Sequence, residues 1–154
     1  MVVKDGGELC GCGRRGCIEA YASATALVRM TKEAMEKNPS SKLWEVSNSL
    51  DVVNGKTAFD AMRMGDEVGK AVVDEYIWNL GCGLSNFINI FQPEVLIIGG
   101  GICKEGETLL APLREILKKE TYGVGNCPAT TLKIAELGND AGTIGAAMLH
   151  KMHQ

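Results

Sequence analysis

Three cysteines and a glutamate gather near the start of the chain, as Cys10, Cys12, Cys17 and Glu19. Glycines separate the cysteines and let the backbone turn tightly enough to bring three sulfur atoms together. Crowded thiolates are soft ligands that favour zinc. Tetrahedral zinc takes one more ligand, and residues 1–9 contain neither His nor Cys. The spacing therefore predicts a zinc site that either is open or has lost its fourth ligand with the beginning of the chain.

Simpler interpretations of these residues stay open at this point. The cysteines are alternatively ordinary thiols or partners in a disulfide, although their crowding and a reducing compartment disfavour the disulfide. Glu19 is alternatively an acid in the first turn of a helix, where the helix dipole stabilises its charge.

A second candidate site is the glycine run Gly99, Gly100 and Gly101. It directly follows Val95–Ile98, a β-branched run that predicts a fully buried strand. Without Cβ atoms the glycines either form a tight turn or let a nucleotide approach the backbone. The run is not a Walker A motif, because no Gly-Lys-Ser/Thr follows it, and it lacks the Gly-x-Gly-x-x-Gly pattern of dinucleotide-binding folds.

The rest of the chain is predicted to be mainly helical. Asp66 is expected to cap the longest helix, in which Gly81 and Gly83 predict close packing against another element. Asn139 and Asp140 are expected to cap the last helix. For Asp140 and Gly142, capping and close packing are the first interpretation, and a nucleotide contact is the alternative. The expected helices cover residues 18–37, 57–64, 67–91, 107–121 and 141–151, and the expected strands cover 95–98 and 131–136, with 38–55 as a loop.

The order of these elements predicts a parallel α/β arrangement with right-handed crossovers. A parallel sheet is buried on both faces and ordinarily has more than two strands. We therefore expect the chain to be the later part of a larger domain, which agrees with the missing zinc ligand.

Composition narrows the class of protein. The chain has 154 residues, enough for a core, and its 45% hydrophobic content suits a soluble globular protein. A net charge of −3, from 16 basic and 19 acidic residues, argues against nucleic acid and anionic membranes as partners. No apolar run approaches the ~20 residues of a membrane span, and no signal peptide is visible. Six cysteines without such a signal predict reduced thiols and a cytoplasmic location.

The cysteine motif carries a family resemblance. Cys-x-Cys-Gly-x-x-Gly-Cys-x-Glu over residues 10–19, followed by Ala-Tyr-Ala-Ser-Ala-Thr-Ala-Leu, resembles the zinc motif of the ROK family (repressors, open reading frames and sugar kinases), and of its glucokinases in particular. Residues 96–102 and 139–147 match the same family in the right order. The resemblance implies an α/β fold, the C-terminal lobe of the actin-like, ribonuclease-H-like ATPase fold, with an incomplete sheet and several helices. It also implies that residues 1–154 form a single partial domain, in which a zinc knuckle at 9–19 precedes a helical and α/β lobe.

The resemblance also implies an activity, the ATP-dependent phosphorylation of the 6-hydroxyl of glucose. Cys10, Cys12 and Cys17 are then ligands of a structural Zn²⁺, Glu19 binds sugar hydroxyls, and the glycine run lies beside ATP, which is bound with Mg²⁺. The family's catalytic Asp and the His that completes the zinc site precede the matched part. No catalytic residue is therefore assigned to this chain, and the chain alone is expected to be inactive. The family further implies a homodimer, with no nucleic-acid or membrane partner.

Other functions stay open on the sequence. One is the sugar-sensing lobe of a ROK transcriptional repressor, and another is a kinase for a different hexose such as N-acetylmannosamine or fructose. A third is a zinc-knuckle binding module without a sugar. The residues between the cysteines, Gly11 and Arg14-Arg15-Gly16, are more similar to those of the family's glucokinases than to those of its repressors.

Overall fold

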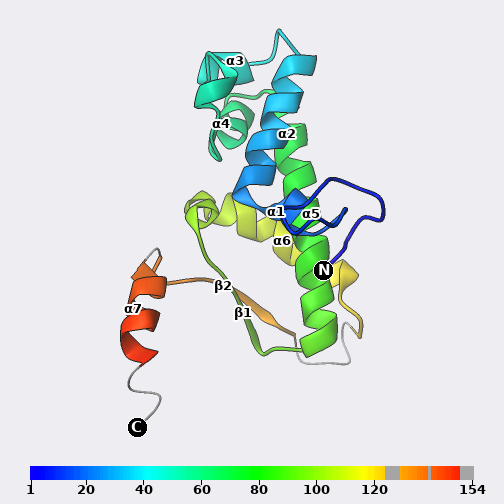
Figure 1. Cartoon of the computed structure of the whole chain (residues 1–154), viewed down its shortest axis with the longest axis vertical. Coiled ribbons are helices and arrows are strands. Elements are labelled where there is room, and N and C mark those ends of the chain that lie inside the picture. The colour runs from blue at the N-terminus through cyan, green and yellow to red at the C-terminus, as the bar shows by residue number, and fades with distance from the viewer. Residues whose placement is uncertain (124–128, 139, 150–154) are drawn as a thin grey trace.

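A computed structural model describes residues 1–123, 129–138 and 140–149 of the chain (Figure 1). Helices make up most of it, and a small parallel sheet follows the longest helix. The α-helices are α1 Glu19–Ala22, α2 Ala24–Lys37, α3 Leu43–Val46, α4 Thr57–Arg63, α5 Glu67–Phe91, α6 Glu107–Glu120 and α7 Asp140–Met148. The 3-10 helices are η1 Leu50–Val52 and η2 Gly101–Glu105, and the strands are β1 Val95–Ile98 and β2 Thr131–Ile134.

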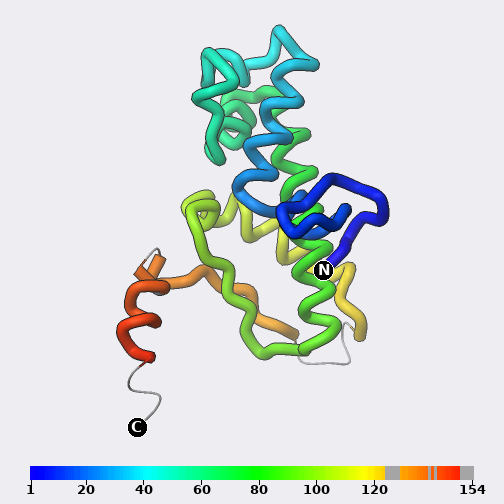
Figure 2. Tube along the Cα trace, viewed as in Figure 1, coloured from blue at the N-terminus to red at the C-terminus, as the bar shows by residue number. Residues whose placement is uncertain are grey.

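Helix α5 runs lengthwise through the molecule and contacts α1, α2, α4 and α6 (Figures 1 and 2). Its first turn is capped by Asp66, whose carboxylate accepts a hydrogen bond from the Gly69 amide at 2.6 Å, as the sequence predicts. It ends at Phe91, and its C-cap residue Gln92 adopts the left-handed conformation with φ 44°. Within the described residues no helix, α5 included, is long and apolar enough to cross a membrane.

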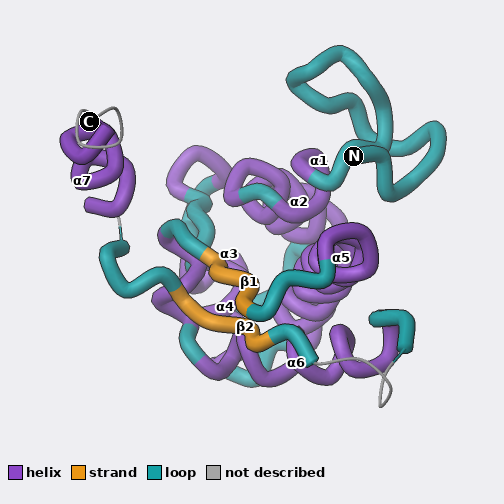
Figure 3. The backbone as a smooth tube through the Cα atoms, turned by 90° about the horizontal axis from the view of Figure 1, so that it is seen from below, coloured by secondary structure: helices purple, strands orange, loops and turns teal. Residues whose placement is uncertain are grey.

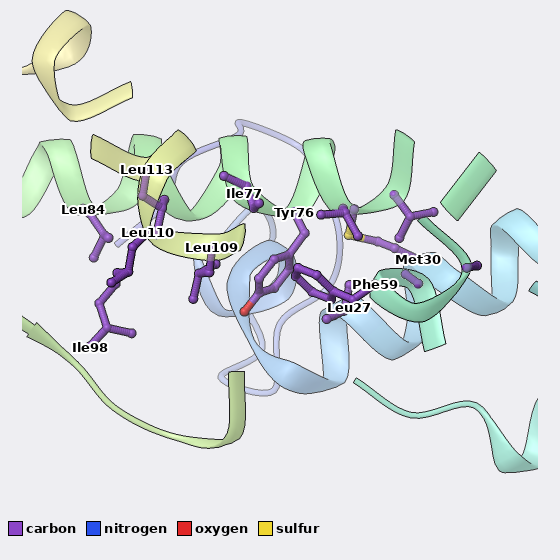
Figure 4. Packing of buried hydrophobic residues seen from close by; sticks show 14 of the residues in the cluster. Leu27, Met30, Phe59, Tyr76, Ile77, Leu84, Ile98, Leu109, Leu110 and Leu113 are labelled. Carbon is purple, nitrogen blue, oxygen red and sulfur yellow. The ribbon is translucent and has the colours of Figure 1, made fainter. Parts of the chain in front are cut away.

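The apolar core follows α5 along its length (Figure 4). At one end Leu27 and Phe59 pack around Tyr76, whose hydroxyl donates to the Ala22 carbonyl at 3.2 Å. At the other end the cluster reaches Ile98 at the close of β1, where α6 contributes leucines. One continuous core thus connects the helices near the N-terminus with the strand that precedes the glycine run.

Two glycines of α5 allow neighbouring segments to approach closely, as predicted. A Cβ atom at Gly81 would lie 2.7 Å from Cγ2 of Ile116 in α6. A Cβ atom at Gly83 would lie 1.9 Å from Cδ1 of Ile18, the residue between Cys17 and Glu19. These contacts account for glycine in a helix interior, where it otherwise costs about 1 kcal/mol relative to Ala.

The two strands pair in parallel, with Val95 opposite Thr131 and Ile98 opposite Ile134. Figure 3 shows the pair against the helices. The prediction of a fully buried first strand is wrong, because Val95 is 43% exposed and Ile97 is 63% exposed. Successive side chains of a strand point to opposite faces, and within the described residues the helices cover only the face that carries Ile98.

Other predicted elements differ from the structure, among them the second strand, predicted over 131–136 and observed at Thr131–Ile134. The helix predicted over 18–37 is divided at Ser23, which is extended and whose hydroxyl accepts from the Ala26 amide at 3.1 Å to start α2. The loop predicted over 38–55 contains α3 and η1. The last helix spans Asp140–Met148, and its expected cap at Asn139 and its expected end at residues 150–151 lie outside the described residues.

Candidate functional site

The cysteine knuckle, residues 9–19, is a small antiparallel turn. Leu9 and Arg15 form a β-bridge, and the Cys10 amide donates to the Arg14 carbonyl at 2.8 Å. The Gly13 amide donates back to the Cys10 carbonyl at 2.9 Å, and Gly13 itself has φ +84°. That left-handed conformation strongly favours glycine. Gly13 therefore allows the backbone to turn between the second and third cysteines.

The first residues of the chain cross the knuckle and hold it closed. The amides of Val3 and Lys4 donate to the Gly16 carbonyl at 2.8 and 3.1 Å. Gly16 has φ +77°, and a Cβ atom there would lie 1.6 Å from the Lys4 carbonyl oxygen. Val2 forms an isolated β-bridge with Cys17. Gly16 is therefore the position at which two stretches of backbone come too close for any side chain.

The structure brings the three predicted ligands together. The sulfur atoms of Cys10, Cys12 and Cys17 all lie within 4.8 Å of one another, and those of Cys12 and Cys17 are 3.6 Å apart as free thiols. In tetrahedral zinc with Zn–S bonds of about 2.3 Å, neighbouring sulfurs are about 3.8 Å apart. The donor set and its spacing therefore fit a zinc ion, and the ion itself stays a prediction. Cys10 and Cys17 are buried, whereas Cys12 faces solvent.

The thiols differ in their pKa values. Backbone and side-chain hydrogen bonds with Arg14 lower the pKa of Cys12 to about 6. A backbone hydrogen bond at Cys12 lowers the pKa of Cys10. The Cys12 side chain, burial and the Glu19 carboxylate outweigh it and raise that pKa to about 11. Zinc binds thiolates, so occupancy of this site would release protons.

Glu19 leaves the knuckle as the first residue of α1. Its side chain is exposed, and Oε2 accepts a hydrogen bond from the Cys10 thiol at 3.3 Å. Tyr21 in the same helix is buried, and its hydroxyl accepts from the Glu8 amide at 2.7 Å. The Cys10 thiol thus orients the carboxylate, Tyr21 ties α1 to Glu8, and the exposed carboxylate can still accept hydrogen bonds from solvent.

The contact between Ile18 and Gly83 sets where the knuckle meets α5, and it can be tested directly. Gly83→Ala is expected to lower the free energy of unfolding by about 1–2 kcal/mol, since overpacking outweighs the gain in helix propensity. It is also expected to weaken zinc binding, because Ile18 adjoins Cys17. Urea unfolding and competition with a chromophoric chelator measure the two effects. Gly81→Ala, which meets α6 instead, should lower stability alone, and equal zinc loss in both variants would contradict this assignment.

The second candidate site is a hollow of about 410 Å³ at the carboxyl ends of β1 and β2. Gly100, Gly101 and Lys104 line one side of it, and the residues after β2, up to Gly138 and Asp140, line the other. Ligands of open parallel sheets bind at this edge. Gly100 has φ +96°, a conformation that favours glycine, and no atom would lie within 4 Å of a Cβ there. The backbone is therefore open to a ligand at this point.

Only some of the residues predicted to contact a nucleotide line this hollow. Gly99 is not part of the lining, and a Cβ there would be 3.7 Å from Ala135. Asp140 lines the hollow and Gly142 does not. The sequence reasoning missed Lys104 and Glu136; Glu136 closely follows β2, a position that could have indicated it, whereas Lys104 lies within η2 after the glycine run. A larger hollow of about 670 Å³ between the ends of α5 and α6 is lined by none of the residues that the sequence singles out.

Comparison with known proteins identifies the family. The ROK family model matches residues 1–153, and the chain belongs to the ROK family. It is 40% identical over 152 residues to a glucokinase of Thermotoga maritima, covering 98% of this chain and 47% of that protein. It is 30% identical over 117 residues to a xylose repressor of Caldicellulosiruptor bescii, covering 75% of this chain and 29% of the repressor.

The structure agrees with the sequence comparison. It superposes with a TM-score of 0.85 on the crystal structure of a ROK family glucokinase from Streptomyces griseus in complex with glucose and AMPPNP, at 37% identity. The match covers 97% of this chain and 49% of that one. The chain therefore has the α/β architecture of the actin-like ATPase fold of ROK sugar kinases, and it spans about half the length of the relatives it matches.

Proposed function

We propose that this chain contributes to a glucokinase, which transfers the γ-phosphoryl group of ATP to the 6-hydroxyl of glucose. The observation that carries the proposal is the contact between the clustered cysteines and Glu19, in a chain whose relatives named glucokinase are 36–40% identical to it. The glucokinase of Streptomyces griseus was crystallised with glucose and AMPPNP, which supports glucose and ATP as the substrates.

In this proposal Glu19 binds the sugar. An ionised carboxylate only accepts hydrogen bonds, which suits several hydroxyl donors on one face of a hexose. Cys10, Cys12 and Cys17 hold a structural Zn²⁺, which when bound would stiffen the loop that carries Glu19. The Cys10 thiol and the buried Tyr21 already direct the start of α1, so zinc would add rigidity to an arrangement that the backbone makes.

The hollow beyond β1 is the proposed nucleotide site. Gly100 and Gly101 let the backbone approach ATP, bound with Mg²⁺, while Gly99 supports the turn from the strand. Phosphoryl transfer depends mainly on positioning and charge neutralisation. The carboxylate base that takes the hydroxyl proton has no counterpart by resemblance among the 154 residues, so we propose that they do not catalyse the reaction alone. We further propose that residues 1–154 form one partial domain of a cytoplasmic homodimer.

The sugar-binding role of Glu19 is tested by calorimetry with glucose on the full-length gene product. Glu19→Gln is expected to weaken glucose binding by about 10-fold to 100-fold, the range for losing hydrogen bonds to a charged group. Glu8→Gln is the matched control, since Glu8 belongs to the same loop and its side chain is half exposed. Equal affinities in both variants and the native protein would contradict the role of Glu19.

A sugar-sensing repressor lobe is the second candidate, because a xylose repressor is 30% identical over 75% of this chain. Calorimetry with both sugars separates the two candidates. A glucokinase lobe binds glucose in preference to xylose and responds to Glu19→Gln. Preference for xylose, together with operator DNA binding by the full-length product, would favour the repressor.

A further inference from the structure

Glu105, the last residue of η2, is a buried carboxylate that the proposed function does not use. Its side chain is 4% exposed, and Oε2 accepts from Nη2 of Arg63 at the end of α4. The two residues are 42 positions apart in the sequence. A buried charge is costly unless it is paired and hydrogen-bonded, so this ion pair fixes the end of η2 against α4. Figure 1 shows the turn after β1 lying below α4.

Arg63 is itself held in place before it reaches Glu105. Its other terminal nitrogen, Nη1, donates to Asp60 at 2.7 Å within the same helix. Its guanidinium carbon lies 6.0 Å from the ring centre of Phe59, a residue of the core that is fully buried. The planar guanidinium is therefore oriented by α4 and presents a directed donor to Glu105.

The glycine run depends on such outside anchors. A Cβ at Gly100 or Gly101 would have no atom within 4 Å, so these residues are not packed against neighbours. On the C-terminal side, η2 is tied back by the Cys103 amide, which donates to the Gly100 carbonyl at 3.1 Å, and by the Cys103 thiol, which donates to the Ile98 carbonyl at 3.3 Å. Both bonds are local to β1 and η2. Ile102 and Cys103 also pack against the apolar core, and the ion pair of Glu105 with Arg63 adds a polar contact from this unit to a helix distant in the sequence.

We propose that Arg63 and Glu105 are positioning residues for the nucleotide site: their ion pair holds η2, and with it Gly100 and Gly101, in the geometry that ATP requires. The proposal rests on the proposed function for its ligand. Neither residue lines the hollow, so the pair acts through η2 and the glycine backbone. It makes the nucleotide site depend on α4, a helix that contributes no residue to the lining of the hollow.

The test compares Glu105→Gln with Asp60→Asn in the full-length gene product. Glu105→Gln keeps the shape of the side chain and removes the charge that pairs with Arg63. Asp60→Asn is the matched control, because it removes only the exposed charge beside the same guanidinium and keeps an Oδ1 acceptor that still orients Arg63. Should Glu105→Gln fail to fold, Arg63→Lys is the second variant. It keeps the positive charge and loses the planar set of N–H donors that the guanidinium presents. Amide hydrogen exchange of residues 99–105 reports on the loop, and calorimetry with Mg²⁺ and AMPPNP reports on the nucleotide site.

We expect faster exchange at residues 99–105 and roughly tenfold weaker AMPPNP binding in Glu105→Gln, with no change in Asp60→Asn. The exchange rate and the AMPPNP affinity of Arg63→Lys should lie between those of Glu105→Gln and Asp60→Asn. A purely structural pair would lower the melting temperature and leave both readouts unchanged in the folded protein, which would overturn the proposal. If the native protein does not bind AMPPNP, the proposed function fails, and the exchange data still decide whether the pair positions the loop.

Discussion

Replacing Asp66 with alanine is expected to lower the free energy of unfolding by about 3–4 kcal/mol, because several buried donors lose their acceptor at once. The carboxylate of Asp66 accepts from the amides of Gly69 and Lys42, each at 2.6 Å, and from the Ser41 hydroxyl at 3.0 Å. It therefore caps α5 and also fixes the segment that leads into α3. Asp66 is 7% exposed, so water does not readily replace these bonds.

The effect of Asp66 has a defined pH dependence. Burial by itself raises the pKa of this carboxyl, but the hydrogen bonds from the Gly69 and Lys42 amides and from Ser41 outweigh it and hold the pKa below its ordinary value. In the unfolded chain the pKa is about 3.9. Because the folded pKa is the lower one, the stabilisation is fully present above about pH 5 and is lost as the pH falls through the folded value.

Urea unfolding at several pH values measures this contribution. The stability curves of the native protein and of Asp66→Ala should run parallel above about pH 5 and converge in acid. Asp74→Ala is the control, since Asp74 is an exposed partner of Lys70 and such pairs contribute about 0.5 kcal/mol or less. If the difference in the free energy of unfolding between the native protein and Asp66→Ala stayed constant down to acidic pH, the charge of the carboxylate would not be the source of the stabilisation.

Local chemistry made several features predictable from the sequence. Asp66 stands before an apolar periodic segment, which is the usual signal of a capped helix. The knuckle was predictable because glycine and cysteine spacing constrain a short backbone strongly, whatever packs around it. Gly81 and Gly83 predicted close packing, but the sequence alone could not say that their partners are Ile116 and Ile18.

What the sequence could not predict depends on tertiary contacts. The sequence pattern is helical on both sides of Ser23, whereas in the structure the Ser23 hydroxyl caps α2 and α1 packs separately against α5. The exposure of Val95 and Ile97 depends on what covers the second face of the sheet, which a run of β-branched residues does not reveal. The pair of Arg63 with Glu105 is invisible for the same reason, because each residue alone resembles an ordinary surface charge.

Gly16→Ala is expected to abolish the cysteine site more completely than any other glycine substitution in the knuckle. The new Cβ would lie 1.6 Å from the carbonyl oxygen of Lys4, which is backbone and cannot rotate away, and φ is +77°. The segment of residues 1–4 would have to move away, and the hydrogen bonds from the Val3 and Lys4 amides to the Gly16 carbonyl would be lost. Since Cys17 is the next residue, we expect zinc affinity to fall by a factor of about 100, as for loss of a group that orients a metal ligand.

A graded series of alanine variants isolates the cause, with zinc affinity measured by chelator competition and by Co²⁺ absorption. Gly11→Ala should bind zinc normally, because Gly11 has no positive φ and a Cβ there meets no atom within 4 Å. Gly13→Ala has open space but φ +84°, so only its backbone strain of about 1–2 kcal/mol should appear. The zinc affinities of the three variants thus separate three effects. Gly11→Ala tests a methyl group in free space, Gly13→Ala tests backbone strain, and Gly16→Ala tests a steric clash with the backbone. Equal affinities across the three variants would mean that the backbone around Gly16 does not hold the sulfur atoms in place.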